Sequence, residues 1–191
     1  MNNILTKDGQ AFYLGQIFSE QESKNWFEIL LKNIEWQQDE VIIFGKKIIT
    51  ARKMQWYAGT AVEYEYSRVK RTARIFTKEL IALKNIVEEK TGAKYNSCLL
   101  NLYHTGDEGM GWHSDSESTL VHNAPIAALS FGAARKMSFK HRQSKETVSI
   151  FLENGSLLLM GKASQTNWQH SIPKTKKVSE PRISLTFRLM K

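Results

Sequence analysis

The feature that most restricts the possible folds is a series of short β-like segments in the second half of the chain, after Gly92. Each segment is largely apolar, and Gly, Asn, Asp and Pro are frequent between them. Closely spaced short strands of this kind are typical of a β-sandwich or barrel. We therefore predict a C-terminal double-sheet barrel. Its strands are expected at Ser97–Tyr103, Ile126–Phe131, Lys136–Phe139, Thr147–Leu152, Ser156–Met160, Trp168–Ile172 and Arg182–Leu189.

Two helices are predicted before this barrel. Ser19 and Glu22 have the spacing of a capping box, which predicts a helix that starts just after Ser19. A second helix is predicted over Thr77–Lys90, because its apolar residues recur at helical spacing and Gly92 follows its end. Since 191 residues suit one ordinary domain, we predict a single α+β domain over residues 1–191 with N-terminal helices that support the barrel.

The charge and the cysteine content limit the possible partners and compartment. Lys and Arg number 27 against 19 Asp and Glu, so the net charge of +8 favours binding to polyanions, although a generic basic protein has the same balance. The single cysteine, Cys98, excludes an internal disulfide and fits a reducing cytosol. No apolar run approaches the ~20 residues of a membrane span, and the first ten residues lack the apolar core of an export signal. We expect a monomer without membrane contact, located in the cytoplasm, or in the nucleus of a eukaryote.

A metal site is suggested by His113 and Asp115, which lie two residues apart. In an extended chain both side chains point to the same face, so an imidazole and a carboxylate can reach one ion. His170, in the strand-like segment Trp168–Ile172, is the best candidate for a third ligand. Two histidines and one carboxylate suit non-haem iron(II), because open positions remain for oxygen and a co-substrate. Taken alone the pattern is weak, and ordinary surface or core histidines explain it more often.

An anion site is suggested by the alternation in Arg182–Arg188. Arg182, Ser184 and Arg188 share one face of the expected strand, together with Thr186, and apolar residues share the other. Inside a barrel, two buried guanidinium groups need an anion. Their Cα atoms would be roughly 20 Å apart, which leaves a gap near the length of a small dicarboxylate once both side chains extend. The alternative is a surface strand with its arginines in water.

A second polar pair, Asn101 and Tyr103, lies in an otherwise apolar segment. An Asn amide and a Tyr hydroxyl are suitable donors to carboxylate oxygens. Taken alone, a structural hydrogen bond between strands explains this pair better.

Taken together, these motifs resemble the AlkB family of iron(II)- and 2-oxoglutarate-dependent dioxygenases, and the similarity is closest to its DNA-repair members. The flanking segments Leu129–Ala133, Trp168–Pro173 and Glu180–Arg182 resemble that family as well. The resemblance covers roughly Arg52–Met190, and the first fifty residues match poorly. One difference is Ser184, where many members carry asparagine.

The resemblance implies a jelly-roll barrel, also called a double-stranded β-helix, over residues 93–191, with helices and a nucleotide-recognition lid over residues 1–92. It implies Fe(II) bound by His113, Asp115 and His170. It implies 2-oxoglutarate held by Asn101, Tyr103, Arg182, Ser184 and Arg188. With O2, the enzyme would oxidise N-methyl groups of bases such as 1-methyladenine and 3-methylcytosine in DNA, with RNA as a second substrate. Succinate, carbon dioxide and formaldehyde would be released.

Substrate contacts are expected mainly in the first half of the chain. A methyl group on a ring nitrogen is hidden in a duplex, so the base must be flipped or single-stranded and needs flat walls to stack on. Trp56, Tyr64 and Tyr66 are candidates for these walls, with core packing as the alternative, and Tyr66 with His113 is the preferred pair. Methylation makes the base cationic, and Glu117 could supply a matching acid.

Phosphate contacts are expected from basic clusters, with Arg68, Arg71, Lys136 and Arg142 as the candidates. Three other functions remain open at this stage. They are a demethylase or hydroxylase that acts on RNA or protein, a zinc hydrolase that uses the same triad, and a non-catalytic nucleic-acid-binding module. The zinc hydrolase leaves Arg182 and Arg188 unexplained, and the intact ligand set disfavours the non-catalytic module.

Overall fold

The computed structural model describes residues 2–43, 46–60, 63–66, 69–161 and 163–191, without the side chains of residues 41–48 and 61–71. The helices are α1 (Glu20–Asn33), α2 (Lys78–Thr91) and α3 (Ser164–Asn167). The strands are β1 (Gln10–Gln16), β2 (Gln37–Ile43), β3 (Lys46–Ala58), β4 (Glu63–Tyr66), β5 (Val69–Thr72), β6 (Arg74–Ile75), β7 (Ser97–Tyr103), β8 (Met110–His113), β9 (Ile126–Gly132), β10 (Arg135–His141), β11 (Thr147–Leu152), β12 (Ser156–Gly161), β13 (Trp168–Ile172) and β14 (Arg182–Arg188).

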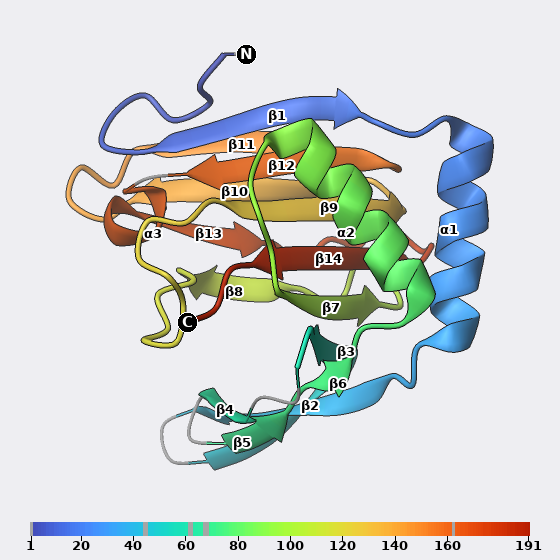
Figure 1. Ribbon diagram of the computed structural model, residues 1–191. Coiled ribbons are helices and arrows are strands. Elements are labelled where there is room, and N and C mark those ends of the chain that lie inside the picture. Colours follow the sequence, from blue (N-terminus) through green and yellow to red (C-terminus); the bar gives the residue numbers. More distant parts are fainter. Residues whose placement is uncertain (1, 44–45, 61–62, 67–68, 162) are drawn as a thin grey trace.

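In the described part of the chain the strands form two facing sheets and a separate ribbon. The large sheet has eight strands in the order β1-β12-β9-β14-β7-β3-β2, with β6 beside β3. The small sheet has the order β11-β10-β13-β8, and β4 pairs with β5 in a ribbon at one end of the molecule (Figure 1). Neighbouring strands are antiparallel except for the parallel pair β3–β6. This arrangement confirms the predicted jelly-roll α+β fold.

The helices form where local capping predicts them. Ser19 Oγ accepts a hydrogen bond from the Glu22 N–H at 3.3 Å, and the Glu22 carboxylate accepts one from the Ser19 N–H at 2.9 Å. Thr77 caps α2, and Gly92 ends it with a φ of 69°, a conformation that glycine adopts without strain. α1 therefore begins directly after its predicted cap, and α2 begins and ends within one residue of its predicted bounds.

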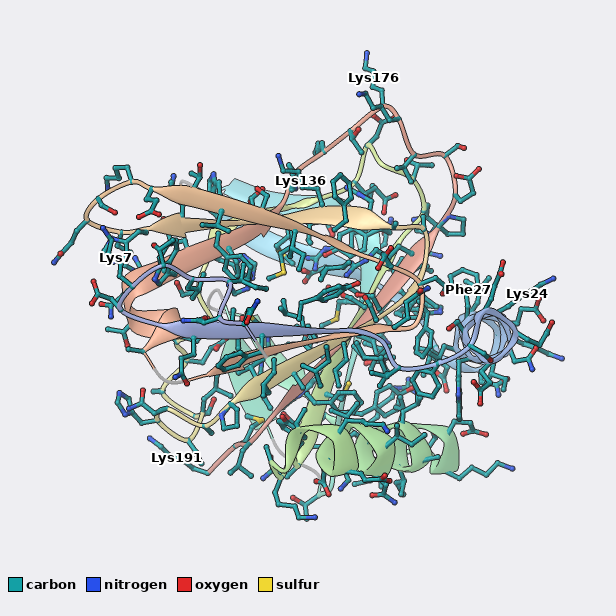
Figure 2. All side chains as sticks on the ribbon, turned by 90° about the horizontal axis from the view of Figure 1, so that it is seen from above. Lys7, Lys24, Phe27, Lys136, Lys176 and Lys191 are labelled. Atoms are coloured by element: carbon teal, nitrogen blue, oxygen red, sulfur yellow. The ribbon has the colours of Figure 1, made fainter. Side chains whose placement is uncertain are left out.

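The two faces of the large sheet have different roles. One face packs against α1 and α2 in an apolar cluster that includes Leu30, Leu83 and Leu185. The opposite face meets the small sheet across a second cluster, which includes Met137 and Leu158. Figure 2 shows α2 on one side of the large sheet and the strands near Lys136 on the other. Because strand residues alternate between faces, the central strands β9 and β12 supply side chains both to the helix-side core and to the space between the sheets.

The first half of the chain contributes more to the large sheet than the sequence predicts. β1 pairs with β12, and β3 pairs with β7, so residues 1–92 supply strands to the jelly roll as well as helices. The predicted division into an N-terminal lid and a barrel confined to residues 93–191 is therefore wrong at this point. The physical reason is that β12 and β7 would otherwise be open edges with unpaired backbone groups. Among the described residues, no helix is both long and apolar enough to cross a membrane.

Candidate metal and co-substrate site

A cavity of about 130 Å³ lies between the two sheets. The large sheet lines it from β3, β7 and β14, and the small sheet lines it from β8, β10 and β13. It brings together ten of the residues predicted from the sequence. These are His113, Asp115, His170, Asn101, Tyr103, Arg182, Ser184, Arg188, Trp56 and Glu117.

Two small-sheet strands position the predicted metal ligands. His113 ends β8, and its Cα pairs with that of His170 in β13. Asp115 follows two residues later, with its Oδ1 3.8 Å from His113 Nε2. One ligand atom from each of the three residues lies within 4.8 Å of the other two, close enough to surround one ion. Two imidazoles and one carboxylate are the donor set of a facial triad, which also accommodates a co-substrate.

Neighbouring groups orient these ligands. His113 Nδ1 lies 2.8 Å from the Gly111 carbonyl, which fixes Nδ1 as the donor and leaves Nε2 to bind a metal. The Asp115 N–H donates to Gln165 Oε1 at 2.9 Å, and the Ser114 hydroxyl donates to the Trp168 carbonyl at 2.7 Å. The segment that directly follows β8, Ser114 and Asp115, is therefore held against α3 and the start of β13.

The charges in the cavity favour the metal-binding forms of the ligands. Burial acts to raise the pKa of Asp115, but Arg188 and the two histidines outweigh it and lower the pKa to about 2. Burial is the main cause that lowers the pKa of His170 to about 4. Near neutral pH, Asp115 is thus a carboxylate and His170 a neutral imidazole, which are the protonation states that coordinate metals.

Arg188 lies against this centre. Its Nη2 is 3.0 Å from Asp115 Oδ2, so the arginine pairs with a metal-ligand carboxylate, a contact that the sequence did not predict. The side chain also lines the cavity. A role of Arg188 in binding 2-oxoglutarate stays a prediction.

Arg182 is the residue of the cavity that most clearly requires a bound anion. It is 2% exposed, and its Nη2 donates to Ser130 Oγ at 2.9 Å. Its Nε and Nη1 are buried without an acceptor in hydrogen-bonding geometry among the described residues. Burial lowers its pKa to about 10, partly offset by the nearby Tyr103 hydroxyl. A buried guanidinium with two unused donors fits a carboxylate, so the site fits 2-oxoglutarate.

The other predicted co-substrate residues face one another across the β7–β14 pair. Asn101 pairs with Ser184, and Tyr103 pairs with Arg182. Arg52 donates hydrogen bonds to Asn101 Oδ1 and to the Asp39 carboxylate, all three being buried. Because its Oδ1 is occupied by Arg52, Asn101 can present its amide nitrogen to the cavity as a donor.

The predicted substrate residues are only partly described. Trp56 is buried and lines the cavity, and Glu117 lines it with an Oε2 that is buried without a hydrogen-bond partner among the described residues. The backbones of Tyr64 and Tyr66 lie in β4 and that of Arg71 in β5, but their side chains are outside the described part of the chain. Arg68 lies outside the described residues altogether.

The two remaining phosphate candidates lie on β10 and just beyond it. Both are exposed, and Arg142 Nη2 donates to Ser114 Oγ at 2.8 Å, beside the metal ligands. Lys136 lies at the other end of β10, six residues earlier, or about 20 Å along a strand. The structure therefore places Arg142, but not Lys136, next to the metal centre.

Sequence reasoning missed four buried partners, Asp39, Arg52, Ser130 and Arg135. Arg135 had a usable signal, because it alternates with Met137 and Phe139 on the inward face of β10. Ser130 had none, since its partner Arg182 lies 52 positions away. Asp39 and Arg52 are only 13 positions apart on neighbouring strands, but the other partner of Arg52, Asn101, lies 49 positions away.

Comparisons with known proteins agree with this geometry. Residues 10–188 match the family described as the 2OG-Fe(II) oxygenase superfamily. The chain is 34% identical to the DNA oxidative demethylase ALKBH2 of Mus musculus, over 90% of this chain and 77% of that protein. The chain belongs to the AlkB family. The predicted Fe(II), 2-oxoglutarate and O2 are those of this superfamily, which confirms that prediction and leaves the zinc hydrolase without support.

Two further AlkB relatives and one structure complete the comparison. Bos taurus ALKBH2 is 34% identical, and the alpha-ketoglutarate-dependent dioxygenase alkB homolog 3 of Bos taurus is 37% identical. The chain spans only 66% and 61% of their lengths. The solved structure of OsALKBH1 superposes with a TM-score of 0.63 at 13% identity, over 93% of this chain and 97% of that one, which shows a shared fold. The family match begins at residue 10, so the predicted start of the resemblance at Arg52 was wrong.

Proposed function

We propose that this AlkB-family protein is an Fe(II)- and 2-oxoglutarate-dependent demethylase that removes N-methyl groups from alkylated nucleobases in DNA. The observation that carries the proposal is a buried carboxylate oxygen of Glu117, which has no hydrogen-bond partner in the described part of the chain and lies in the same cavity as the metal triad. A ring nitrogen that carries a methyl group makes 1-methyladenine and 3-methylcytosine cationic. An acid with an unused oxygen favours such a base over its neutral parent. The relatives named DNA oxidative demethylase support the same substrate class.

Each group of residues has a distinct role in this proposal. His113, Asp115 and His170 hold iron, and Arg182 holds one carboxylate of 2-oxoglutarate with its two unused donors. Asn101, Tyr103, Ser184 and Arg188 line the rest of the co-substrate's site. When bound, iron, 2-oxoglutarate and O2 supply an oxidant for the methyl C–H bond. Asp115 and His170 are buried, which limits the access of water to that side of the reaction.

The methylated base must leave the stacked bases of the DNA to reach the cavity. Trp56 provides a flat, buried wall on the large sheet, and Tyr64 and Tyr66 on β4 are proposed as further stacking partners. Arg68, Arg71, Lys136 and Arg142 are proposed to contact phosphates. We further propose that the protein acts as an intracellular monomer.

Mass spectrometry of methylated oligonucleotides tests the proposal. Single and duplex DNA and RNA that carry 1-methyladenine or 3-methylcytosine are incubated with protein, Fe(II), 2-oxoglutarate and ascorbate. We expect loss of one methyl group from DNA, together with stoichiometric succinate. Demethylation of RNA alone would favour the RNA alternative. Succinate formation without any change in an oligonucleotide would contradict a nucleic-acid substrate and favour a protein.

The role of Glu117 is testable by charge. We predict that Glu117→Gln lowers turnover of cationic 3-methylcytosine by roughly tenfold relative to neutral 3-methylthymine, because the attraction to the cation is lost. Glu146→Gln removes an acid remote from the cavity and is the control. An equal loss on both bases would show that Glu117 only shapes the pocket.

A further inference from the structure

The buried side chain of Arg135 has no role in the site described so far. It starts β10 and is 1% exposed, one of the largest fully buried side chains among the described residues. A buried guanidinium is expensive unless it is paired or fully hydrogen-bonded. Its position therefore calls for a function.

The hydrogen bonds of Arg135 join two segments that lead to the metal ligands. Its Nη2 donates to the carbonyls of Glu108 at 2.8 Å, Pro173 at 3.0 Å and Gly106 at 3.3 Å, and its Nη1 donates to the Thr105 carbonyl at 3.3 Å. Thr105, Gly106 and Glu108 lie between Tyr103 and β8, whereas Pro173 directly follows β13. These bonds satisfy carbonyls but leave the positive charge without a bonded carboxylate, and the Arg135 Nε is unpartnered among the described residues.

Arg135 and Arg182 lie at the same tyrosine. The guanidinium carbon of Arg135 is 5.7 Å from the centre of the Tyr103 ring, and that of Arg182 is 5.5 Å from it. The charge of Arg135 is close enough to contribute to the lowered pKa of Arg182, after the larger effect of burial. Two buried cations thus flank one tyrosine of the cavity wall, and the carboxylate of Glu108 acts to raise the pKa of Arg135. The Glu108 carboxylate is engaged by the His104 N–H at 3.0 Å and by the His104 ring at 2.9 Å.

We propose that Arg135 is a positioning residue for 2-oxoglutarate, which holds Tyr103 in place and supplies a second positive charge for the distal carboxylate that Arg182 binds. This inference rests on the proposed function, because it takes Arg182 as the carboxylate anchor. The positive charges of Arg182 and Arg135 would then both attract the distal carboxylate. The site would therefore bind a 2-oxo dicarboxylate more tightly than a 2-oxo acid with one carboxylate. Arg135 would act without touching the co-substrate.

The test compares two ligands that differ only in the distal group. Calorimetry on protein loaded with Mn(II) gives the affinities for 2-oxoglutarate and for 2-oxopentanoate, which has a methyl group in place of the distal carboxylate. We expect Arg135→Gln to lower the preference for 2-oxoglutarate by about tenfold while it changes 2-oxopentanoate binding by less than about twofold. Arg135→Lys, which keeps the charge, should restore most of the preference. Lys24→Gln removes one positive charge from an exposed position on α1 and is the control.

Each outcome of these binding measurements supports or overturns either the role of Arg135 or the proposed co-substrate site. An equal loss of both ligands in Arg135→Gln would mean that Arg135 only braces the loop, which overturns the inference. If Arg182→Gln leaves the preference unchanged, the proposed co-substrate site itself is wrong. If Arg182→Gln abolishes the preference and Arg135→Gln does not alter it, only the present inference fails. Should Arg135→Gln not fold, Glu108→Gln replaces it. Removal of this nearby negative charge should raise the preference severalfold, and an unchanged preference would overturn the inference.

Discussion

Asp115 belongs to two sets of interactions at once. Its carboxylate lies with the imidazoles of His113 and His170, and it also pairs with Arg188 at 3.0 Å. A residue on the co-substrate side of the cavity is therefore tied directly to a metal ligand. Loss of the carboxylate should affect both metal binding and the position of the arginine.

We predict that Asp115→Ala folds but loses metal affinity by more than the roughly 10- to 100-fold typical for a residue that only orients a ligand. Calorimetric titration with Mn(II) measures the effect. The exposed Asp107 on the preceding loop provides the control Asp107→Ala. Near-normal metal affinity in Asp115→Ala would remove Asp115 from the ligand set.

For single residues, the sequence predicts pairs that lie within one segment and misses contacts between different strands. The pair His113 and Asp115 is visible because both residues lie within one extended segment. The contacts of Arg188 with Asp115 and of Arg182 with Ser130 join residues 73 and 52 positions apart. Such pairs depend on which strands become neighbours, and no spacing rule for a single segment contains that information.

Among the helices and strands, the junction between α2 and β7 depends on one buried acid. Glu88 accepts hydrogen bonds at 2.9 Å from the Tyr95 N–H, Lys84 and Lys94. Burial acts to raise the pKa of Glu88, but these three partners outweigh it and lower the pKa to about 2. The folded-state pKa therefore lies below the unfolded value of about 4.3. Its stabilising effect is present above the unfolded value and is lost as the pH falls through about 4 towards 2.

We predict that Glu88→Gln lowers the free energy of unfolding by about 1–3 kcal/mol at neutral pH, because charge-assisted hydrogen bonds are lost. The difference from the wild type should shrink as the pH falls below about 4. Thermal melts across this range measure it, with the exposed neighbour changed in Glu89→Gln as the control. A difference that persists unchanged in acid would mean that packing, rather than charge, explains the loss.

The elements themselves are predicted well where each has its own pattern. β7, β11 and β13 have the predicted bounds, α1 begins after its predicted cap, and α2 begins one residue after its predicted start. The place of β3 beside β7 was not predicted. Aromatic and charged residues there lack a clean alternation, because this strand is at once a cavity wall and a neighbour of β2.

For the whole molecule, the net charge of +8 matters through its distribution. Lys136 and Arg142 mark the two ends of β10, and Arg142 contacts the metal-binding segment through Ser114. Lys24 lies on α1, apart from the small sheet (Figure 2). If nucleic acid follows β10, Lys136 and Arg142 contact phosphates and Lys24 does not.

We predict that Lys136→Ala and Arg142→Ala each weaken binding of methylated and unmodified DNA alike. Each should reduce the slope of log affinity against log salt by about 1. Fluorescence anisotropy at several salt concentrations measures this. An equal effect of Lys24→Ala would indicate attraction to the overall charge instead of a defined path.

The alternation of β14 links the chemistry of this protein to its folding. Ile183, Leu185 and Phe187 pack in the helix-side core, while Arg182, Ser184 and Arg188 line the cavity. A slip of this strand by one residue would drive guanidinium groups under α1 and α2 and turn three apolar side chains towards the metal. Such a molecule would lose its core and its anion site in the same event. A stable population with the wrong register is therefore not expected, and specific activity should measure the natively folded fraction of any preparation whose cavity residues are unchanged.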